Sequence, residues 1–347
     1  MKQHQKKVLI VGAGLSGCTI ARKLAEANVH CTVIDRRSHI AGNTFDFENQ
    51  LGIKQHKYGP HLFHTSNLKV VEFLSRFTDW TPYKHKVKAQ LADGKLVTLP
   101  INLETKEIVG ADNCVEIFIR PYSEKMWGMP LESIDPQIIN RVPMRDDLNE
   151  YYFPNDNFQA LPTQGYTRMV EDMLSHSNIL VNLETDFNDD MMADFDHVFH
   201  SGSIDEFLKF KFGPLPYRSI KFHNVNMPVA QMYPVSVVNF TDHGKFTRVV
   251  EWKNLPKHGA NETHTTLTFE EPCDYSQNNF ERYYPVKDTS GTYKKLYDRY
   301  KNFVSENHPN ITFCGRLGLY AYLDMHQAVS SSLKLSDAWI KAHLNEK

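Results

Sequence analysis

Apolar and polar positions follow two different periods along this chain. An apolar run at 7–11 predicts a β-strand, helical spacing follows through residue 24, and 30–35 predicts a second strand. Further helical periods lie at 66–79, 103–120, 168–174, 292–306 and 325–343. Strands are predicted at 179–187, 197–201 and 311–315, with a hairpin at 87–99 and short alternating runs at 230–240, 247–252 and 263–271. Residues 141–165, with weak periodicity, predict a loop.

The turn after the first strand carries the most informative motif. It reads Gly12-x-Gly14-x-x-Gly17, and Asp35 ends the second strand 18 residues beyond Gly17. Glycines at these positions let a pyrophosphate approach the backbone at a helix N-terminus, and an acid at this distance meets a ribose hydroxyl. The pattern predicts a β-α-β unit that binds FAD or NAD, and the strand at 197–201 is expected to return to the same sheet.

A second motif near the C-terminus favours FAD. A predicted strand ends at Gly315, Arg316 follows, and Asp324 precedes a helix as its expected N-cap. The positive end of that helix would face the electron-rich pyrimidine side of a reduced flavin. An enzyme that uses nicotinamide has no need of this returning element.

Composition excludes several classes of protein. The 347 residues carry a net charge of −2, so no basic surface indicates nucleic acid. No apolar stretch approaches the roughly 20 residues of a membrane span, and the polar N-terminus does not resemble a signal peptide. Five widely spaced cysteines without a C-x-x-C motif predict reduced thiols and a cytoplasmic location. A zinc site at His56, His61 and His64 is not expected, because the other ligands are missing.

Five segments resemble the bacterial UDP-galactopyranose mutases. They are HKYGPHLFHT (56–65), PYSEKMWG (121–128), FTRVVE (246–251), YYPV (283–286) and GRLGLYAYLDMHQ (315–327). Their order along nearly the whole chain makes the resemblance specific. It implies an α/β fold with a Rossmann-like FAD-binding domain, a small helical domain and an antiparallel β-sheet substrate domain. The implied domain boundaries are 1–79, 190–216 and 305–347 for FAD, 80–140 for the helices, and 141–189 with 217–304 for the sheet.

The resemblance implies an isomerase that uses reduced FAD without net redox change. Flavin N5 attacks the anomeric carbon, the nucleoside diphosphate leaves, and the sugar recloses from pyranose to furanose through a covalent flavin N5–sugar adduct. The expected substrate is UDP-galactopyranose, and UDP-galactofuranose serves cell-surface polysaccharide synthesis. An external reductant such as NAD(P)H would keep the flavin reduced.

Residue roles are partly read from the motifs and partly implied by the resemblance. The residues expected to bind FAD are Gly12, Gly14, Leu15, Ser16, Asp35, Arg36, Gly42, Asn43, His61, Gly202, Arg316, Asp324 and Met325. The expected catalytic residues are Arg248, His64, Tyr284 and Tyr322. Substrate contacts are expected from Tyr122, Trp127, Asn157 and Tyr166, and again from Arg248, Tyr284 and Tyr322. No metal is expected.

The chain departs from the family pattern in two places. The segment between Pro100 and Tyr122 is shorter than in typical members, so the helical domain is trimmed. That domain contributes to the family's dimer interface, so the sequence leaves a homodimer open. Asn157 stands where the family usually carries a second arginine that clamps the diphosphate, which leaves the identity of the nucleotide sugar open.

Three alternative functions fit parts of the sequence. The same chemistry would suit another nucleotide sugar, such as a dTDP-6-deoxy-galactose in a dTDP-fucopyranose mutase. An FAD-dependent oxidoreductase of the amine oxidase type would share only the FAD domain. A paralogue that binds nucleotide sugars without catalysis would keep the binding residues alone.

Overall fold

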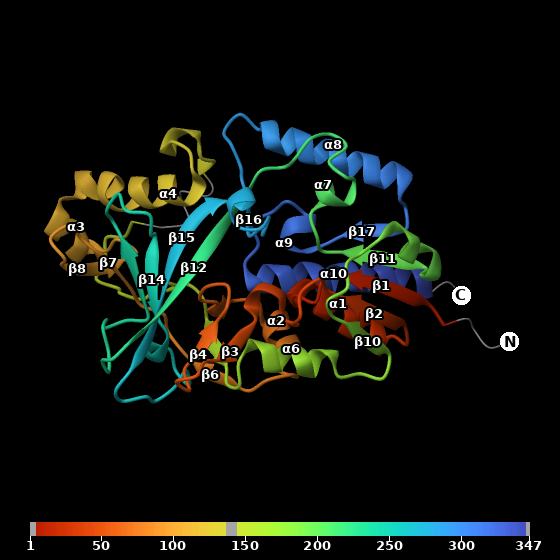
Figure 1. The fold of residues 1–347 in the computed structure, drawn as a ribbon, viewed down its shortest axis with the longest axis horizontal. Coiled ribbons are helices and arrows are strands. Elements are labelled where there is room, and N and C mark those ends of the chain that lie inside the picture. The colour runs from red at the N-terminus through yellow and green to blue at the C-terminus, as the bar shows by residue number, and fades with distance from the viewer. Residues whose placement is uncertain (1–4, 137–143, 345–347) are drawn as a thin grey trace.

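The computed structural model describes residues 5–136 and 144–344 (Figure 1). Its N-terminal motif opens a sheet of five parallel strands in the order β10-β2-β1-β11-β17. These strands are β1 (Lys7–Val11), β2 (His30–Ile34), β10 (Ile179–Asn182), β11 (His197–His200) and β17 (Ile311–Phe313). The strand near residue 197 therefore returns beside β1, as predicted, and the carboxyl ends of all five strands meet at one edge.

Helices cover both faces of the parallel sheet. The side chains of Val8 and Ile10 share one buried cluster with Ile20 of α1 (Leu15–Glu26) and Val329 of α10 (Met325–Leu344). Leu9 points to the opposite face and packs with Tyr300 of α8 (Thr292–Asn307). This alternation along β1 is the expected consequence of burial on two faces. Further helices are α2 (Leu68–Leu74), α6 (Tyr166–Leu174), α7 (Ile204–Phe207) and α9 (Gly315–Gly318).

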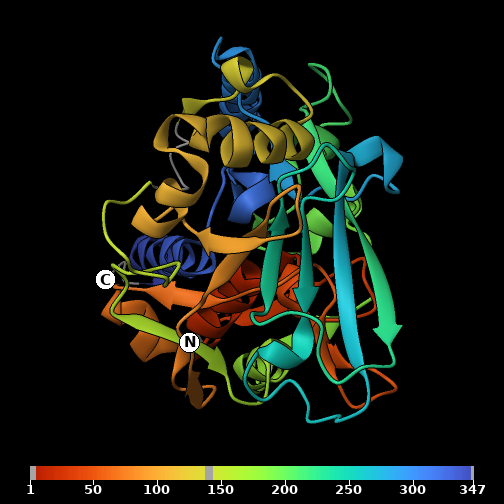
Figure 2. The ribbon, with the colours of Figure 1, turned by 90° about the vertical axis from the view of Figure 1, so that its left-hand side faces the viewer.

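A mixed sheet of seven strands forms the other half of the molecule, and its long strands lie side by side in Figure 2. The order is β16-β12-β15-β14-β13-β7-β8, with every pair antiparallel except β13 and β7. The bounds are β7 (Val87–Gln90), β8 (Leu96–Leu99), β12 (Tyr217–Met227), β13 (Val237–Phe240), β14 (Arg248–Glu251), β15 (Thr265–Asp274) and β16 (Tyr284–Pro285). Two small sheets contain β3 (Asp46–Glu48) with β4 (Lys54–His56), and β5 (Phe63–Thr65) with β9 (Phe158–Pro162) and β6 (Trp80–Pro82).

The prediction of one continuous helix at 103–120 was wrong. It is divided into α3 (Leu103–Val109), a π-helical turn at Val115–Ile119 and α4 (Arg120–Trp127). Gly110 ends α3 with a φ of +84°, a conformation that glycine adopts without strain. The shorter helices lie above the large sheet in Figure 1.

Three segments differ from their predicted assignments, namely β10, the hairpin β7–β8 and β9. β10 belongs to the parallel sheet, where Ile179 pairs with Cys31, although 141–189 was assigned to the antiparallel sheet domain. The hairpin β7–β8 was assigned with the helices at 80–140, but β7 extends the large sheet by pairing with β13. β9 lies within the loop predicted at 141–165. The predictions for these segments used the local sequence pattern, and a local pattern does not specify which strand a segment pairs with.

Three findings concern the thiols, metal sites and membrane-spanning helices of the described residues. All five cysteines are free and buried. Within 5–136 and 144–344 no three His, Cys, Asp or Glu side chains group as a metal site. No helix in these ranges is both long and apolar enough to cross a bilayer.

Candidate active site

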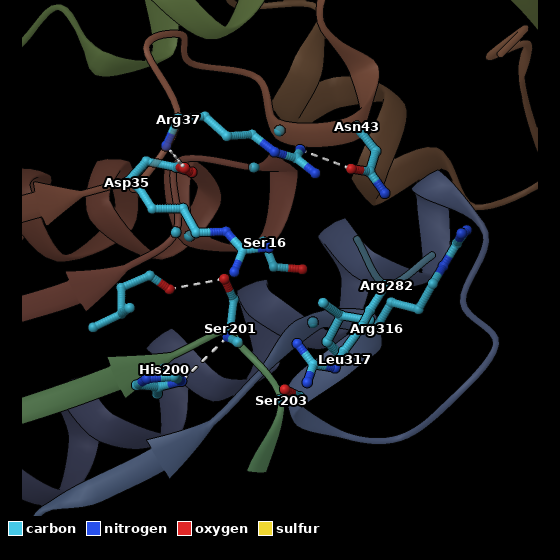
Figure 3. A pocket seen from close by; sticks show the side chains of 18 of the residues that line it. Ser16, Asp35, Arg37, Asn43, His200, Ser201, Ser203, Arg282, Arg316 and Leu317 are labelled. Carbon is cyan, nitrogen blue, oxygen red and sulfur yellow. Dashed lines mark hydrogen bonds between the residues drawn. The ribbon is translucent and has the colours of Figure 1, made fainter. Parts of the chain in front are cut away.

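A cavity of about 1050 Å³ opens at the carboxyl edge of the parallel sheet. Its walls come from both ends and from the middle of the chain, and Figure 3 shows Asp35 and Asn43 on one side with Ser203 and Arg316 on the other. All the residues predicted to bind FAD line it except Asp324. The two motifs that are most distant in the sequence therefore build one site.

The glycines of the first motif are required for different structural reasons. A Cβ at Gly12, where φ is +107°, would lie 1.9 Å from Ser201 Oγ, and a Cβ at Gly17 would lie 2.0 Å from the carbonyl oxygen of Gly12. These two positions are fixed by packing. A Cβ at Gly14 would meet only the Cα of Gly42, at 3.7 Å, so the fold has room for it. Gly14 lines the cavity, and its missing side chain leaves space suited to a pyrophosphate.

Asp35 is held by the loops on either side of it. Oδ2 accepts a hydrogen bond from the backbone N–H of Ala13 at 2.8 Å, and Oδ1 accepts one from the backbone N–H of Arg37 at 2.9 Å. Each oxygen keeps a second lone pair that a ribose hydroxyl can use. The carboxylate therefore fixes the first turn, lines the cavity and can still accept a further hydrogen bond.

The C-terminal motif places a guanidinium at the end of the cavity. Arg316 Nη2 donates to the carbonyl oxygen of Leu323 at 2.7 Å, and its guanidinium carbon lies 5.0 Å and 5.1 Å from the ring centroids of Tyr284 and Tyr322. Asp324 begins α10, since its carbonyl accepts the N–H of Ala328 and its own N–H donates to the side chain of Gln327. Asp324 acts at the helix start, as in a capping box, rather than in the cavity wall.

A second cluster of side chains begins where Arg316 ends. The rings of Tyr284 and Tyr322 stack with centroids 5.4 Å apart, and Trp127 lies 6.3 Å and 6.5 Å from them. Burial raises the pKa of Tyr284 to about 12, with Tyr322 adding to the shift. Burial also raises the pKa of Tyr122. Both phenols are therefore protonated near neutral pH and able to donate hydrogen bonds.

Arg248, at the start of β14, faces the same cluster. Its Nε donates to Glu270 Oε2 at 2.7 Å, the one hydrogen bond of this guanidinium to the described residues. Burial opposes the charged form, but the carboxylate of Glu270 outweighs it and raises the pKa of Arg248. The terminal amines keep the fork geometry that matches phosphate oxygens.

Lysine and arginine side chains hold the elements of this cluster together. Lys125 Nζ donates to three carbonyl oxygens of the turn that leads into β14, those of Phe240, Asp242 and Phe246. Arg218 Nε donates to the carbonyl oxygen of Met126 at the end of α4, next to Trp127. These bonds fix α4 relative to the strand that carries Arg248.

Glu270 was missed by the sequence analysis. Its side chain is only 1% exposed, and Oε1 has no hydrogen-bond partner among the described residues. The same strand also carries Glu271, Asp274 and three threonines, so the sequence offered no distinct signal for Glu270. Pairing of Arg248 with Glu270 across β14 and β15 then places the carboxylate behind the guanidinium.

Glu270→Gln should weaken substrate binding about fivefold to thirtyfold, seen as a higher KM, because a charge-assisted contact worth about 1–2 kcal/mol no longer orients Arg248. The amide keeps the shape, so thermal unfolding should change little beyond the lost pair. Steady-state kinetics and calorimetric titration with a nucleoside diphosphate measure the effect. Glu271→Gln, on the same strand but facing His223 and Lys245, is the matched control. An unchanged KM in Glu270→Gln would contradict the orienting role.

Two histidines of the HKYGPHLFHT segment (56–65) differ in position. His61 lines the cavity, and burial together with the charges of Arg316 and Arg248 lowers its pKa to about 4. It is therefore neutral at pH 7. His64 does not line the cavity; its Nδ1 pairs with Asp156 Oδ2 at 2.6 Å.

Two predicted substrate residues are not brought to the cluster. The Tyr166 side chain is 1% exposed and packs edge-on against His56, while its backbone N–H donates to Asp46 Oδ2. Asp46 binds the start of α6, and the buried Tyr166 ring is not part of the cavity lining. Its expected contact with the diphosphate stays a prediction. Asn157 is exposed, and its backbone N–H donates to Ser66 Oγ at 3.2 Å.

The family model described as UDP-galactopyranose mutase matches residues 117–322, which include the α4, β14 and β16 parts of this cluster. This chain belongs to that family. A model for an NAD(P)-binding Rossmann-like domain matches residues 10–77, the part that contains the glycine motif. The recognised family and the α/β fold with an antiparallel sheet region are thus confirmed.

Relatives and solved structures agree with this membership. The chain is 32% identical to a probable UDP-galactopyranose mutase of Klebsiella pneumoniae, covering 99% of this chain and 97% of the relative. It is also 32% identical to a dTDP-fucopyranose mutase of Escherichia coli, covering 96% and 98%. A crystal structure of reduced UDP-galactopyranose mutase superposes with a TM-score of 0.77 at 14% identity, covering 99% of this chain and 97% of that one.

Proposed function

We propose that this protein is a mutase that uses reduced FAD to interconvert the pyranose and furanose forms of a nucleotide sugar. The observation that carries the proposal is the position of Arg316. Its guanidinium belongs both to the dinucleotide cavity and to the stacked tyrosines, so the two sites share one wall. A cofactor in the cavity would end where a diphosphate could bind Arg248.

The cavity residues fit a flavin dinucleotide. The space at Gly14 suits the pyrophosphate and Asp35 suits the adenosine ribose. Met325 and Ala328, in the first turn of α10, line the cavity at the end where the helix dipole favours a reduced flavin. When bound, reduced FAD supplies the nucleophile that displaces the diphosphate from the anomeric carbon.

The chain's own residues would bind and retain the leaving group. Arg248 provides a fixed charge for the diphosphate, and the hydroxyl groups of Tyr284 and Tyr322 donate hydrogen bonds to it. The aromatic rings of these tyrosines and of Trp127 exclude water from the same place, which protects the opened sugar from hydrolysis. Neutral His61 adds no charge at the cavity wall.

The substrate we propose is UDP-galactopyranose, in line with the family model and the Klebsiella relative. A dTDP-6-deoxyhexose is the second candidate, favoured by the Escherichia coli dTDP-fucopyranose mutase at the same 32% identity. Exposed Asn157 brings no second charge to the diphosphate in either case. A cytoplasmic location is supported by the five free cysteines.

Turnover should require reduced flavin while consuming no stoichiometric reductant. Purified protein is assayed with UDP-galactose and with dTDP-6-deoxy-galactose, using dithionite or NAD(P)H as reductant, and products are separated by chromatography. Cyanoborohydride added during turnover should yield flavin that carries a covalently linked hexose, detected by mass. Equal rates with oxidised flavin, or one reductant consumed per product, would favour the oxidoreductase alternative.

A further inference from the structure

One short segment links the cofactor cavity to the tyrosine cluster. Residues 279–284, here called the strap, connect β15 to β16 of the large sheet and pass along the cavity on the way. Asn279, Glu281 and Arg282 line the cavity, and Tyr284 at the other end stacks on Tyr322. Figure 3 shows Arg282 next to Arg316 at the cavity wall.

The strap is tied to the cavity wall by charged pairs from two sides. Glu281 Oε2 pairs with Arg37 Nη2 at 2.5 Å, and Arg37 Nη1 donates to Asn43 Oδ1 at 2.9 Å. Arg282, with 3% of its side chain exposed, pairs with Glu206 at 2.9 Å. Every one of these partners lines the cavity. A ligand that orders Asn43 and Arg37 therefore also orders Glu281.

Backbone hydrogen bonds hold the strap between Arg282 and Tyr284, the tyrosine expected to contact the substrate. The carbonyl oxygen of Tyr283 accepts a hydrogen bond from Arg316 Nη1 at 3.4 Å. The backbone N–H of Tyr283 donates to the carbonyl oxygen of Arg218 at 3.0 Å. Tyr284 is the next residue and begins β16. Two residues therefore lie between Glu281, the partner of Arg37, and the Tyr284 ring that faces Arg248.

The backbone at the start of the strap is strained. Asn279 and Phe280 are consecutive residues other than glycine with φ of +50° and +57°. The Phe280 side chain is 59% exposed, so burial of its ring does not account for the conformation. Such a conformation persists only where surrounding contacts impose it. The backbone N–H of Glu281 closes the turn on the carbonyl oxygen of Asn278 at 2.9 Å, and the charged pairs of Glu281 and Arg282 hold the residues that follow.

We propose that Glu281 and Arg282 are positioning residues that couple cofactor binding to nucleotide binding by fixing Tyr284. The inference rests on the proposed function, because it takes the cavity ligand as FAD and the ligand at Tyr284 as a nucleoside diphosphate. Binding linkage is reciprocal, so a diphosphate that binds more tightly when FAD fixes Tyr284 must also raise the affinity for FAD by the same factor. The coupling passes through this chain's own ion pairs.

Release of FAD from the holoenzyme tests the proposal without turnover. The equilibrium for FAD release is followed by flavin fluorescence on dilution, with and without saturating UDP or dTDP. In the wild type the better nucleotide should tighten FAD about tenfold, within the usual range of coupling between sites. In Glu281→Gln that ratio should fall to about twofold or less, while thermal unfolding of the holoenzyme shows that the fold is kept.

Matched variants separate coupling from general damage. Glu271→Gln loses a pair with Lys245 outside the strap and should keep the wild-type ratio. Phe280→Gly frees the strained backbone and should also lower the ratio, whereas Phe210→Gly, at the same φ of +57° outside the strap, should not. This second pair keeps the proposal testable if Glu281→Gln folds poorly.

The outcomes distinguish this inference from the proposed function. If Glu281→Gln and Phe280→Gly keep the wild-type ratio, the strap does not carry the coupling, and the mutase function is unaffected. If no nucleotide changes FAD release in a wild type that turns over, the inference is again overturned alone. If neither UDP nor dTDP binds the holoenzyme and no sugar is converted, the proposed function fails and the inference fails with it.

Discussion

Replacing Arg248 with alanine should lower kcat/KM by about tenfold to a hundredfold. A charge-assisted hydrogen bond contributes about 1.5–3 kcal/mol, and about 1.4 kcal/mol corresponds to a factor of ten. The loss should exceed that of an exposed arginine, because this guanidinium lies in a largely buried cluster with protonated tyrosines around it. Steady-state kinetics with reduced protein measure the effect, and the flavin spectrum should be unchanged.

The partner of Arg248 requires a control of its own. Arg248→Ala leaves the buried carboxylate of Glu270 without its ion pair, which destabilises a protein by about 3–5 kcal/mol when the charge is fully buried. The double variant Arg248→Ala with Glu270→Gln removes that charge and should recover stability but not activity. Arg248→Lys, which keeps the charge and loses the fork, should fall between. Near-normal kinetics in the folded double variant would contradict the role in diphosphate binding.

Those parts of the site that depend on local chemistry were predictable from sequence. The glycine motif, Asp35 after the second strand and Arg316 before the last helix can each be interpreted from the few residues around them. The structure places all three motifs around one cavity. Local backbone requirements such as the positive φ at Gly12 leave direct marks in the sequence.

The parts that depend on pairing between distant segments were not predictable in the same way. Glu270 gains its meaning only from its position opposite Arg248, and strand register is set by tertiary contacts. β10 reads locally as a strand for either sheet, and only its pairing with β2 decides between them. Tyr166 was assigned from the family resemblance, and its buried ring is not part of the cavity lining.

Gly14→Val should abolish FAD binding and with it all measurable mutase activity, while the fold is kept. The residue has φ −83° and ψ 179°, extended values that valine adopts readily. Its Cβ would meet only the Cα of Gly42 at 3.7 Å, an ordinary contact. The remaining methyl groups enter the cavity that Gly14 lines, at the place where the pyrophosphate must approach the helix N-terminus.

The choice of glycine decides whether this experiment reports on the ligand or on the fold. Gly17→Ala would place a Cβ 2.0 Å from the carbonyl oxygen of Gly12, so loss of flavin there would follow from damage to the β-α-β unit. Gly14→Ala adds one carbon to the cavity wall and should weaken FAD binding less than valine does. The flavin absorbance of purified protein and its thermal unfolding with and without added FAD measure both effects. In Gly14→Val, added FAD should no longer raise the unfolding temperature, since a ligand stabilises only the state that binds it. A Gly14→Val protein that retains flavin at the wild-type ratio would show that the pyrophosphate does not approach this turn.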